Sequence, residues 1–230
     1  HMFVRQLFDA DTWTYSYLVA DPTTGDAALI DPVDTQVERD LKLIEELGFE
    51  LRYVLETHVH ADHITSAGHI ADRTGAQTVA HARGASCADL HVEHGNKLAL
   101  GELEIEVLGT PGHTDDSLSF RVGTNVFTGD ALFIRGSGRT DFQNGDPAQL
   151  FDSITRVLFA LPDATTVWPG HDYKGMSSST IGEEKQFNPR LAGKSSVEFA
   201  DIMNNLGLPA PKKLAESVPA NRRCGQALSN

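Results

Sequence analysis

The strongest constraint on this fold is a cluster of metal-binding residue types that directly follows an apolar run. Residues 52–56 (RYVLE) lead into Thr57-His58-Val59-His60-Ala61-Asp62-His63, which holds three histidines and one aspartate. Neutral imidazole is the commonest side-chain metal ligand. Such a cluster has little use in an apolar core, because every buried polar atom needs a hydrogen-bond partner. A solvated polar loop is the alternative, but the pattern favours a metal site.

The composition indicates a globular domain and argues against a nucleic-acid partner. The chain has 230 residues, of which 40% are hydrophobic and 22% charged, and its formal net charge is −13. Nucleic-acid phosphates require a basic surface, which this balance does not provide. The apolar runs are far shorter than a membrane span, and no targeting segment is visible. We therefore expect no membrane partner and a cytoplasmic protein of bacterial type.

Two cysteines, Cys87 and Cys224, lie far apart and form no CxxC pattern. This spacing implies no disulfide framework and fits a reducing compartment. We expect Cys87 to be a small buried side chain in a helix. Cys224 follows Arg222 and Arg223, and these cations could lower the pKa of its thiol, but a reactive cysteine is not the favoured interpretation.

Hydrophobic periodicity predicts strands that dominate early and helices interspersed among them. The expected strands are residues 3–8, 15–20, 27–30, 51–56, 77–80, 97–100, 103–108, 118–122, 125–128 and 165–168. The expected helices are residues 36–47, 64–74, 147–158 and 196–206. Residues 82–94 fit neither pattern, and the tail from Pro209 is expected to be extended over the body. This order predicts an α/β sandwich in a single domain over residues 2–230, with residues 173–230 packed on it.

Four of the predicted strands end in the same way. Each gives way to Thr, Gly or Pro and then to a potential ligand: His58, His113, Asp130 or His171. Strand ends at one edge of a sheet are where α/β folds gather functional groups, and glycine lets the backbone turn tightly there. Taken separately, each residue would be an ordinary loop or turn residue. The repetition of the pattern is what indicates a shared site.

These residues resemble the signature of the metallo-β-lactamase superfamily. The HxHxDH motif is made up of His58, His60, Asp62 and His63. The three further residues of the signature follow in the expected order, and they are His113, Asp130 and His171. The resemblance implies an αββα four-layer sandwich with a short C-terminal helical extension and a metal site at one edge, between the two sheets. It does not select a reaction, because one fold hosts many chemistries.

A narrower resemblance is to the persulfide dioxygenases. It is carried by residues 57–65 (THVHADHIT), 129–143 (GDALFIRGSGRTDFQ), 171–173 (HDY) and 218–225 (VPANRRCG). In the related glyoxalase II enzymes the segment after the aspartate differs and a larger helical domain follows. Here only 59 residues (230 − 171) follow His171.

This narrower resemblance implies one Fe(II) per chain, held by His58, His113 and Asp130. Two histidines and one carboxylate are the ligand set of non-haem iron oxygenases, and they leave coordination sites open. The implied reaction converts glutathione persulfide, O2 and water to glutathione and sulfite. Zinc could occupy the same residues, but it has no redox chemistry. A homodimer is expected from the family alone.

The remaining site residues are assigned supporting roles. Those implied to hold or orient the ligands, rather than to bind iron, are His60, Asp62, His63, His171 and Asp172. The candidates for binding anionic glutathione are Arg139, Tyr173, Lys174, Arg190 and Arg222. Arg139 and Tyr173 rank first because they lie in the motif-bearing loops. For Arg190 and Arg222 an ordinary surface cation is the favoured interpretation.

Two rival functions use the same residues. In the first, a glyoxalase II-like enzyme holds two metals and hydrolyses a glutathione thioester by means of a metal-bound hydroxide. His60, Asp62, His63 and His171 would then be ligands. In the second, the chain is a non-catalytic metal-binding or thiol-binding module that acts as a redox sensor. Metal content and turnover distinguish these functions from the dioxygenase.

Overall fold

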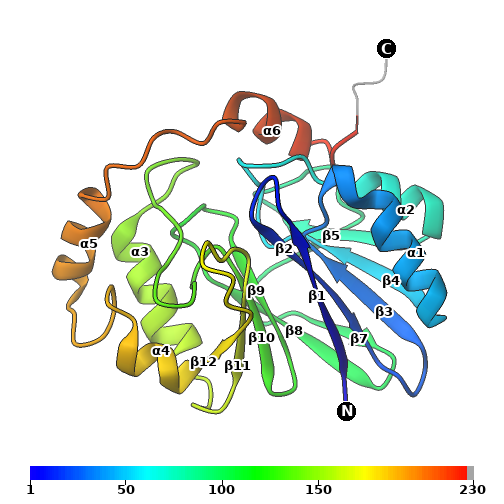
Figure 1. The fold of residues 1–230 in the computed structure, drawn as a ribbon, viewed down its shortest axis with the longest axis horizontal. Helices are drawn as coiled ribbons and strands as arrows, with labels where there is room; N and C mark the ends of the chain where they lie inside the picture. Colours follow the sequence, from blue (N-terminus) through cyan, green and yellow to red (C-terminus); the bar gives the residue numbers. More distant parts are fainter. Residues whose placement is uncertain (227–230) are drawn as a thin grey trace.

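Two six-stranded sheets form the centre of the molecule, and helices cover their outer faces (Figure 1). The computed structural model describes residues 1–226. The N-terminal sheet has its strands in chain order: β1 (Phe3–Asp9), β2 (Thr14–Ala20), β3 (Asp26–Ile30), β4 (Glu50–Leu55), β5 (Gln77–His81) and β6 (Leu90–Val92). Strands β1, β2 and β3 pair antiparallel, whereas β3 to β6 pair parallel.

The C-terminal sheet runs in the reverse of chain order. Its strands are β12 (Ser179–Thr180), β11 (Thr166–Pro169), β10 (Asn125–Gly129), β9 (Leu118–Val122), β8 (Leu103–Gly109) and β7 (Lys97–Leu100). Only β10 and β11 pair parallel, and the other neighbours are antiparallel. Because β10 and β11 are parallel, the ligand candidates that follow them emerge at the same edge.

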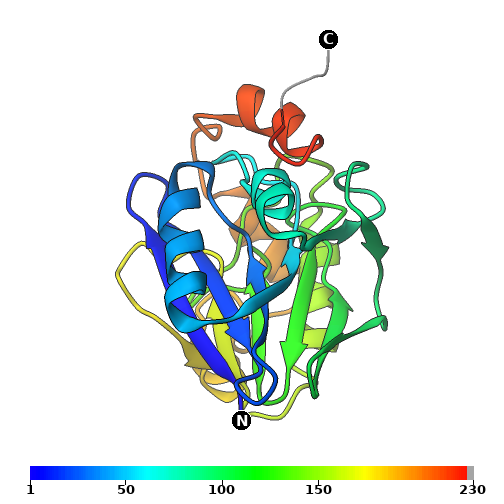
Figure 2. The same ribbon diagram turned by 90° about the vertical axis from the view of Figure 1, so that its right-hand side faces the viewer.

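Helices form the two outer layers. Helices α1 (Val37–Leu47) and α2 (Ala67–Thr74) cover the N-terminal sheet, while α3 (Pro147–Asp152), α4 (Ile181–Phe187) and α5 (Ser196–Asn204) lie on the C-terminal sheet (Figure 1). Helix α6 (Leu214–Asn221) lies across one end of the sandwich (Figure 2). No helix among the described residues combines the length and apolarity needed to span a membrane.

Three apolar clusters hold the four layers of helices and sheets together. The first lies between the sheets and includes Tyr17, Phe120 and Phe127. The second lies under α1 and α2, and the third joins α3 and α5 to the C-terminal sheet. Burial is greatest in the strands that are covered on both faces, as in β2, where every residue is buried. The predicted αββα sandwich is thus confirmed.

Most predicted elements are present within a few residues of their expected ends, with three differences. The helix expected over 147–158 changes to a π-helical segment at Ser153–Leu158. The ambiguous residues 82–94 form turns and the short strand β6. The tail beyond Pro209 was expected to be extended, and this was wrong, because α6 forms within it. Helix α6 contains Pro219, and a proline inside a helix weakens its sequence signal.

The prediction for the cysteines was also wrong. Cys87 lies exposed in a turn rather than buried in a helix, and it forms a disulfide with Cys224, which is buried. The two residues are 137 positions apart in the chain, and their Cα atoms are 6.1 Å apart. No spacing motif marks such a pair, because only the folded chain brings the two segments together.

A buried carboxyl group in α1 gives a testable pH dependence of stability. Asp40 is fully buried, and its only ion-pair partner among the described residues is Arg39, whose Nε lies 3.0 Å from Asp40 Oδ1. Burial raises the pKa of Asp40 to about 6, although Arg39 acts in the opposite direction. Between pH 4 and 6 the folded chain retains a proton that the unfolded chain has lost, so this carboxyl group makes stability fall as pH rises.

We expect Asp40→Asn to remove that fall and to raise the free energy of unfolding at pH 8 by about 2 kcal/mol. Urea unfolding of both proteins between pH 4 and 8 measures the effect. Glu45→Gln is the matched control, because Glu45 is an exposed carboxylate in the same helix and should change little. Equal effects of the two substitutions at pH 8 would contradict the assignment.

Candidate metal centre

Three potential ligands converge where β4, β8 and β10 end. His58 Nε2 lies 3.7 Å from Asp130 Oδ2, and His113 Nε2 lies 3.3 Å from the same oxygen. Ligand atoms of these three residues all lie within 4.8 Å of one another. His58 is buried, whereas His113 and Asp130 are half-buried. Two imidazole nitrogens and a carboxylate oxygen therefore surround a position that a single metal ion fits.

The ring orientation of both histidines is fixed from the side away from Asp130. The Thr57 hydroxyl donates to Asp31 Oδ2 at 2.7 Å, so it accepts from His58 Nδ1 at 2.9 Å. His113 Nδ1 donates to the carbonyl oxygen of Arg139 at 2.6 Å. With both Nδ1 atoms protonated, each Nε2 keeps its lone pair for the position beside Asp130. Such partners are what orient the histidine ligands of a metal.

Glycines allow the backbone to approach this position closely. A Cβ on Gly170 would lie 2.6 Å from Asp130 Oδ1, and one on Gly138 would lie 2.9 Å from His113 Nδ1. Such contacts are shorter than van der Waals distances, so neither position could carry a side chain without a shift of the site.

The electrostatics favour the ligand form of each residue. Burial acts to raise the pKa of Asp130, but its interactions with the surrounding histidines, above all His171, outweigh burial and lower that pKa below the usual range. Burial, aided by His60, lowers the pKa of His58 well below its usual value. An ionised carboxylate and a neutral imidazole are the forms that bind metal.

The other residues of the signature form a second cluster beside the first. Ligand atoms of His60, Asp62 and His63 also lie within 4.8 Å of one another. His171 Nε2 bridges the two clusters, at 3.4 Å from Asp130 Oδ1 and 3.2 Å from Asp62 Oδ2. Its Nδ1 donates to the carbonyl oxygen of Trp13 at 2.9 Å. All seven signature residues therefore meet at one end of the sandwich.

His60 is also held by two buried carboxylates. Its Nε2 lies 3.1 Å from both Asp31 Oδ1 and Glu56 Oε2. Burial acts to lower the pKa of His60, but Asp31 and Glu56 together raise it well above its usual value. His60 Nδ1 and His63 Nε2 are buried and have no hydrogen-bond partner within residues 1–226. Within the described residues, these two nitrogens of the second cluster therefore remain open to a further hydrogen bond or to a metal ion.

Sequence reasoning missed several residues of this site. Asp31 receives hydrogen bonds from both the amide and the hydroxyl group of Thr57. It follows β3 directly, so the strand-end pattern could have identified it. The Thr14 hydroxyl lies 3.3 Å from Asp62 Oδ2, and Asn221 binds the backbone around His63. Thr14 belongs to no pattern that marks a site, whereas Asn221 lies in the segment 218–225 that carries the narrower resemblance.

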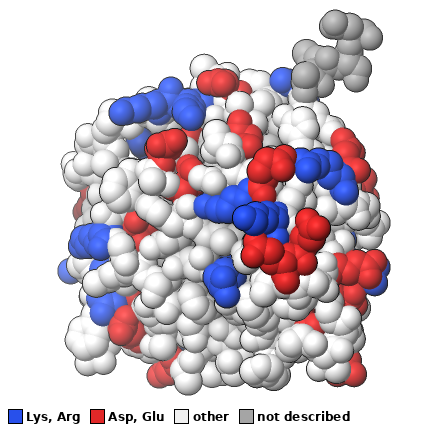
Figure 3. All heavy atoms as spheres, turned by 45° about the vertical axis from the view of Figure 1, so that its right-hand side comes forward, with Lys and Arg blue, Asp and Glu red and all other residues white. Residues whose placement is uncertain are grey.

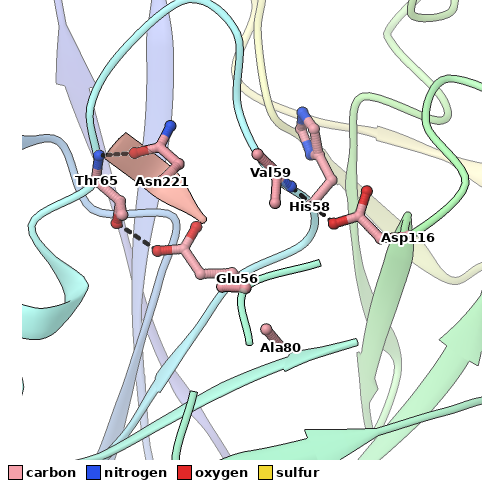
Figure 4. Close-up of a pocket in the computed structure, with 8 residues that line it drawn as sticks. Glu56, His58, Val59, Thr65, Ala80, Asp116 and Asn221 are labelled. Atoms are coloured by element: carbon pink, nitrogen blue, oxygen red, sulfur yellow. Dashed lines mark hydrogen bonds between the residues drawn. The ribbon is translucent and has the colours of Figure 1, made fainter. Parts of the chain in front are cut away.

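A small cavity lies beside His58, and Glu56, Thr65, Asp116 and Asn221 also line it (Figure 4). Val59, Ala80 and Ala85 give it an apolar lining, and several of its polar groups are hydrogen-bonded. The Thr65 hydroxyl donates to Glu56, and the Val59 amide donates to Asp116 Oδ2 at 2.8 Å. The hydrogen bond to Asp116 therefore fixes the backbone directly after His58.

The candidates for substrate binding differ in how far they are already engaged. Arg139 forms two hydrogen bonds with Asp141, at 2.6 and 2.7 Å, and also donates to the carbonyl oxygen of Pro209 at 2.6 Å. Tyr173 is 62% exposed, and its ring stacks on His171 at a centroid distance of 5.9 Å. Asp141 therefore already engages the guanidinium group of Arg139.

The other three cations and Asp172 have less direct links to the site. Arg190 is half-buried and donates to the carbonyl oxygen of Ser137 at 2.7 Å. Lys174 and Arg222 are exposed. Asp172 accepts the amides of Lys174 and Met176, at 2.9 and 2.6 Å, so its contacts shape the loop after His171. On the face in Figure 3, Lys and Arg lie among Asp and Glu and form no continuous basic surface.

The Thr57 contact gives a prediction for metal affinity. Thr57→Val keeps the shape of the side chain but removes the oxygen that accepts from His58 Nδ1. We expect the affinity for a metal ion to fall about 10-fold to 100-fold, as for the loss of other groups that orient a ligand. Metal titration of the purified variant measures this. Thr57→Ser restores the hydroxyl and should restore most of the affinity, and equal affinities of the Val and Ser variants would contradict the role.

Comparison with known proteins agrees with this geometry. Residues 14–86 and 88–171 match the family model of the metallo-beta-lactamase superfamily. Mitochondrial persulfide dioxygenase ETHE1 of Mus musculus is 43% identical over 227 residues, which is 97% of this chain and 89% of that protein. A crystal structure of ETHE1 from Myxococcus xanthus has 57% identity and a TM-score of 0.96, covering 97% of this chain and all of that one.

A hydrolase of the superfamily is a weaker match. The hydroxyacylglutathione hydrolase of a Polaromonas species is 35% identical over 180 residues, which is 75% of this chain and 67% of that protein. The dioxygenase relatives match nearly the whole chain, including the C-terminal part that contains α6. The chain belongs to the metallo-β-lactamase superfamily and, within it, to the persulfide dioxygenases.

Proposed function

We propose that this chain is a mononuclear iron(II) enzyme that converts glutathione persulfide, O2 and water to glutathione and sulfite. The observation that carries the proposal is the convergence of His58 Nε2, His113 Nε2 and an Asp130 oxygen, with each histidine oriented from its other nitrogen. This donor set is the two-histidine, one-carboxylate set that suits non-haem iron(II).

The donor set fits the metal in charge as well as in type. Asp130 supplies one negative charge, and the buried, neutral His58 supplies a lone pair. Three protein ligands leave open positions for substrates. Iron(II) held there would supply the redox chemistry that allows O2 to react with the persulfide sulfur.

The surrounding residues position the substrate and hold a proton. Burial acts to lower the pKa of His171, but Asp130 and Asp62 raise it to about 10, so His171 carries a proton between these two carboxylates at neutral pH. Tyr173 stacks on this ring and is exposed, so it can contact an incoming thiol compound. Arg139, on the loop that also orients His113, is the guanidinium we assign to a glutathione carboxylate.

The second cluster of possible ligands is the observation that supports the rival function, a hydrolase with two metal ions. His60, Asp62 and His63 offer ligand atoms within 4.8 Å, and two of their nitrogens have no partner in the described part of the chain. A second metal held there would favour hydrolysis of a glutathione thioester. We assign these residues to support of the first site, because His60 Nε2 is already engaged by Asp31 and Glu56.

Oxygen uptake tests the proposal. Iron-loaded protein given glutathione persulfide is expected to consume O2 and to form one sulfite for each O2. The metal-free protein is the control, and metal analysis should give one iron per chain. Two metals per chain, together with hydrolysis of a glutathione thioester and no oxygen uptake, would establish the rival function instead.

A further inference from the structure

One side chain of the C-terminal segment (residues 214–226) holds the loop that bears the histidine cluster (residues 57–65, the histidine loop). Asn221 Nδ2 donates to the carbonyl oxygens of His60 and His63, at 2.9 and 2.8 Å. Its Oδ1 accepts from the amide of Thr65 at 2.8 Å, a contact drawn in Figure 4. Asn221 is only 3% exposed, so water does not substitute for these bonds.

These contacts matter because they fix the backbone on both sides of the signature aspartate. Buried amide and carbonyl groups need partners, and here one amide side chain serves three of them. The histidine loop has no regular secondary structure of its own that could supply those bonds. Its shape therefore depends on a segment that follows it by more than 150 positions, since Thr65 and Asn221 are 156 positions apart.

The C-terminal segment is in turn attached close to Asn221. Cys224, three positions after Asn221 (224 − 221), forms the disulfide with Cys87 in the turn that follows β5. Its carbonyl oxygen also accepts from the amide of Gly68, at 3.1 Å, at the start of α2. The Cys224 side chain packs with Ala80, Ala85 and Ala88, whereas Cys87 is exposed. One sulfur of the bond can therefore be reached from solvent.

We propose that Cys87 and Cys224 form a reversible thiol–disulfide site whose oxidation state sets how firmly Asn221 holds the histidine loop. Glutathione and its disulfide are the chemical partners of this site. This site rests on the proposed function in one respect, because the histidine loop is taken to be part of the metal centre.

Two steps of thiol–disulfide exchange with glutathione reduce the Cys87–Cys224 bond. A glutathione thiolate attacks the exposed Cys87 sulfur, the Cys87–Cys224 bond breaks, and Cys224 leaves as a thiolate that takes up a proton. This first step leaves Cys87 in a mixed disulfide with glutathione. A second glutathione thiolate then releases Cys87 as a thiol and forms glutathione disulfide. The reverse sequence oxidises the pair.

Reduction leaves the C-terminal segment held by non-covalent contacts. These include the Gly68–Cys224 backbone bond, the three Asn221 bonds and a hydrogen bond from Gln226 to Asp72 at 2.8 Å. A segment held in this way opens locally more often than one that is covalently closed. Each opening frees the histidine loop, so reduction is expected to increase its mobility.

Hydrogen exchange at the Thr65 amide tests this on metal-free protein. We expect exchange at least about tenfold faster after reduction than in the oxidised protein. Cys87→Ser, at an exposed turn position, should exchange at the reduced rate with or without reductant. Should that variant fail to fold, the comparison of oxidised and reduced wild type decides the question alone. Equal exchange in the two states overturns the proposal.

A second variant tests whether the effect passes through Asn221. In Asn221→Ala the amide of Thr65 is expected to exchange quickly in both redox states, so reduction adds little. A full effect of reduction in this variant would show that the disulfide acts by another route. Metal release to a chelator gives a parallel readout, and we expect reduced wild type to release metal about tenfold faster.

The mass of the intact protein at defined ratios of glutathione to glutathione disulfide tests reversibility. A mass change of two hydrogens that follows this ratio supports a reversible site. Free thiols at every ratio, or a disulfide that no ratio reduces, overturns it. None of these measurements uses persulfide turnover, so their outcome is distinct from that of the proposed reaction.

Discussion

Asp130→Ala is expected to lose its iron and to show no oxygen uptake with glutathione persulfide above that of metal-free protein. Asp130 is the only anionic member of the triad with His58 and His113, and its Oδ2 lies 3.7 Å from His58 Nε2 and 3.3 Å from His113 Nε2. Removing it leaves two neutral imidazoles. The loss of a group that merely orients a ligand costs about 10-fold to 100-fold in affinity, and the loss of a ligand should cost more. Metal analysis and oxygen uptake measure the result.

Asp62→Ala is the matched control for this experiment. Asp62 also lies beside His171, at 3.2 Å from its Nε2, so the variant removes the same charge from the same ring. We expect it to retain one iron per chain and to keep measurable oxygen uptake. If both variants lose metal to the same extent, then Asp62 is a ligand too, and the two-metal hydrolase becomes the better description.

The layered fold and the gathering of His58, His113, Asp130 and His171 at one edge could be predicted because both have local signatures. Apolar runs marked the strands, and the change to Gly, Thr or Pro before His113, Asp130 and His171 marked the edge where their side chains meet. Each of these patterns lies within about ten residues, so a single sequence reveals it. Asp31 also follows a strand, but no Gly, Thr or Pro separates it from Ile30, so it lacked part of that signature.

The supports of the site could not be predicted, because they depend on packing between distant segments. Asn221 reaches the histidine loop only after α6 has folded across the end of the sandwich (Figure 2). The prediction for that tail was an extended segment, which would have left Asn221 without a defined position. The partner of Cys224 was hidden for the same reason, since the turn that holds Cys87 has no regular pattern.

Exchange of iron for zinc is expected to separate metal binding from oxygen chemistry. Zn²⁺ binds imidazole nitrogen and carboxylate oxygen, so His58, His113 and Asp130 should hold it and raise the melting temperature of the metal-free protein. Zinc has no redox chemistry, so oxygen uptake with glutathione persulfide should be absent. Thermal unfolding and oxygen uptake, measured on one preparation of metal-free protein divided between the two metals, test both statements.

The iron-loaded half of that preparation is the control, and it should recover both stability and oxygen uptake. Equal oxygen uptake by the zinc form would mean that O2 reacts without a redox metal, which contradicts the proposed function. A zinc form that binds two ions per chain and hydrolyses a glutathione thioester would instead assign His60, Asp62 and His63 to a second metal. Within residues 1–226, two nitrogens of the second cluster have no hydrogen-bond partner, so both assignments are chemically open. This experiment decides between them.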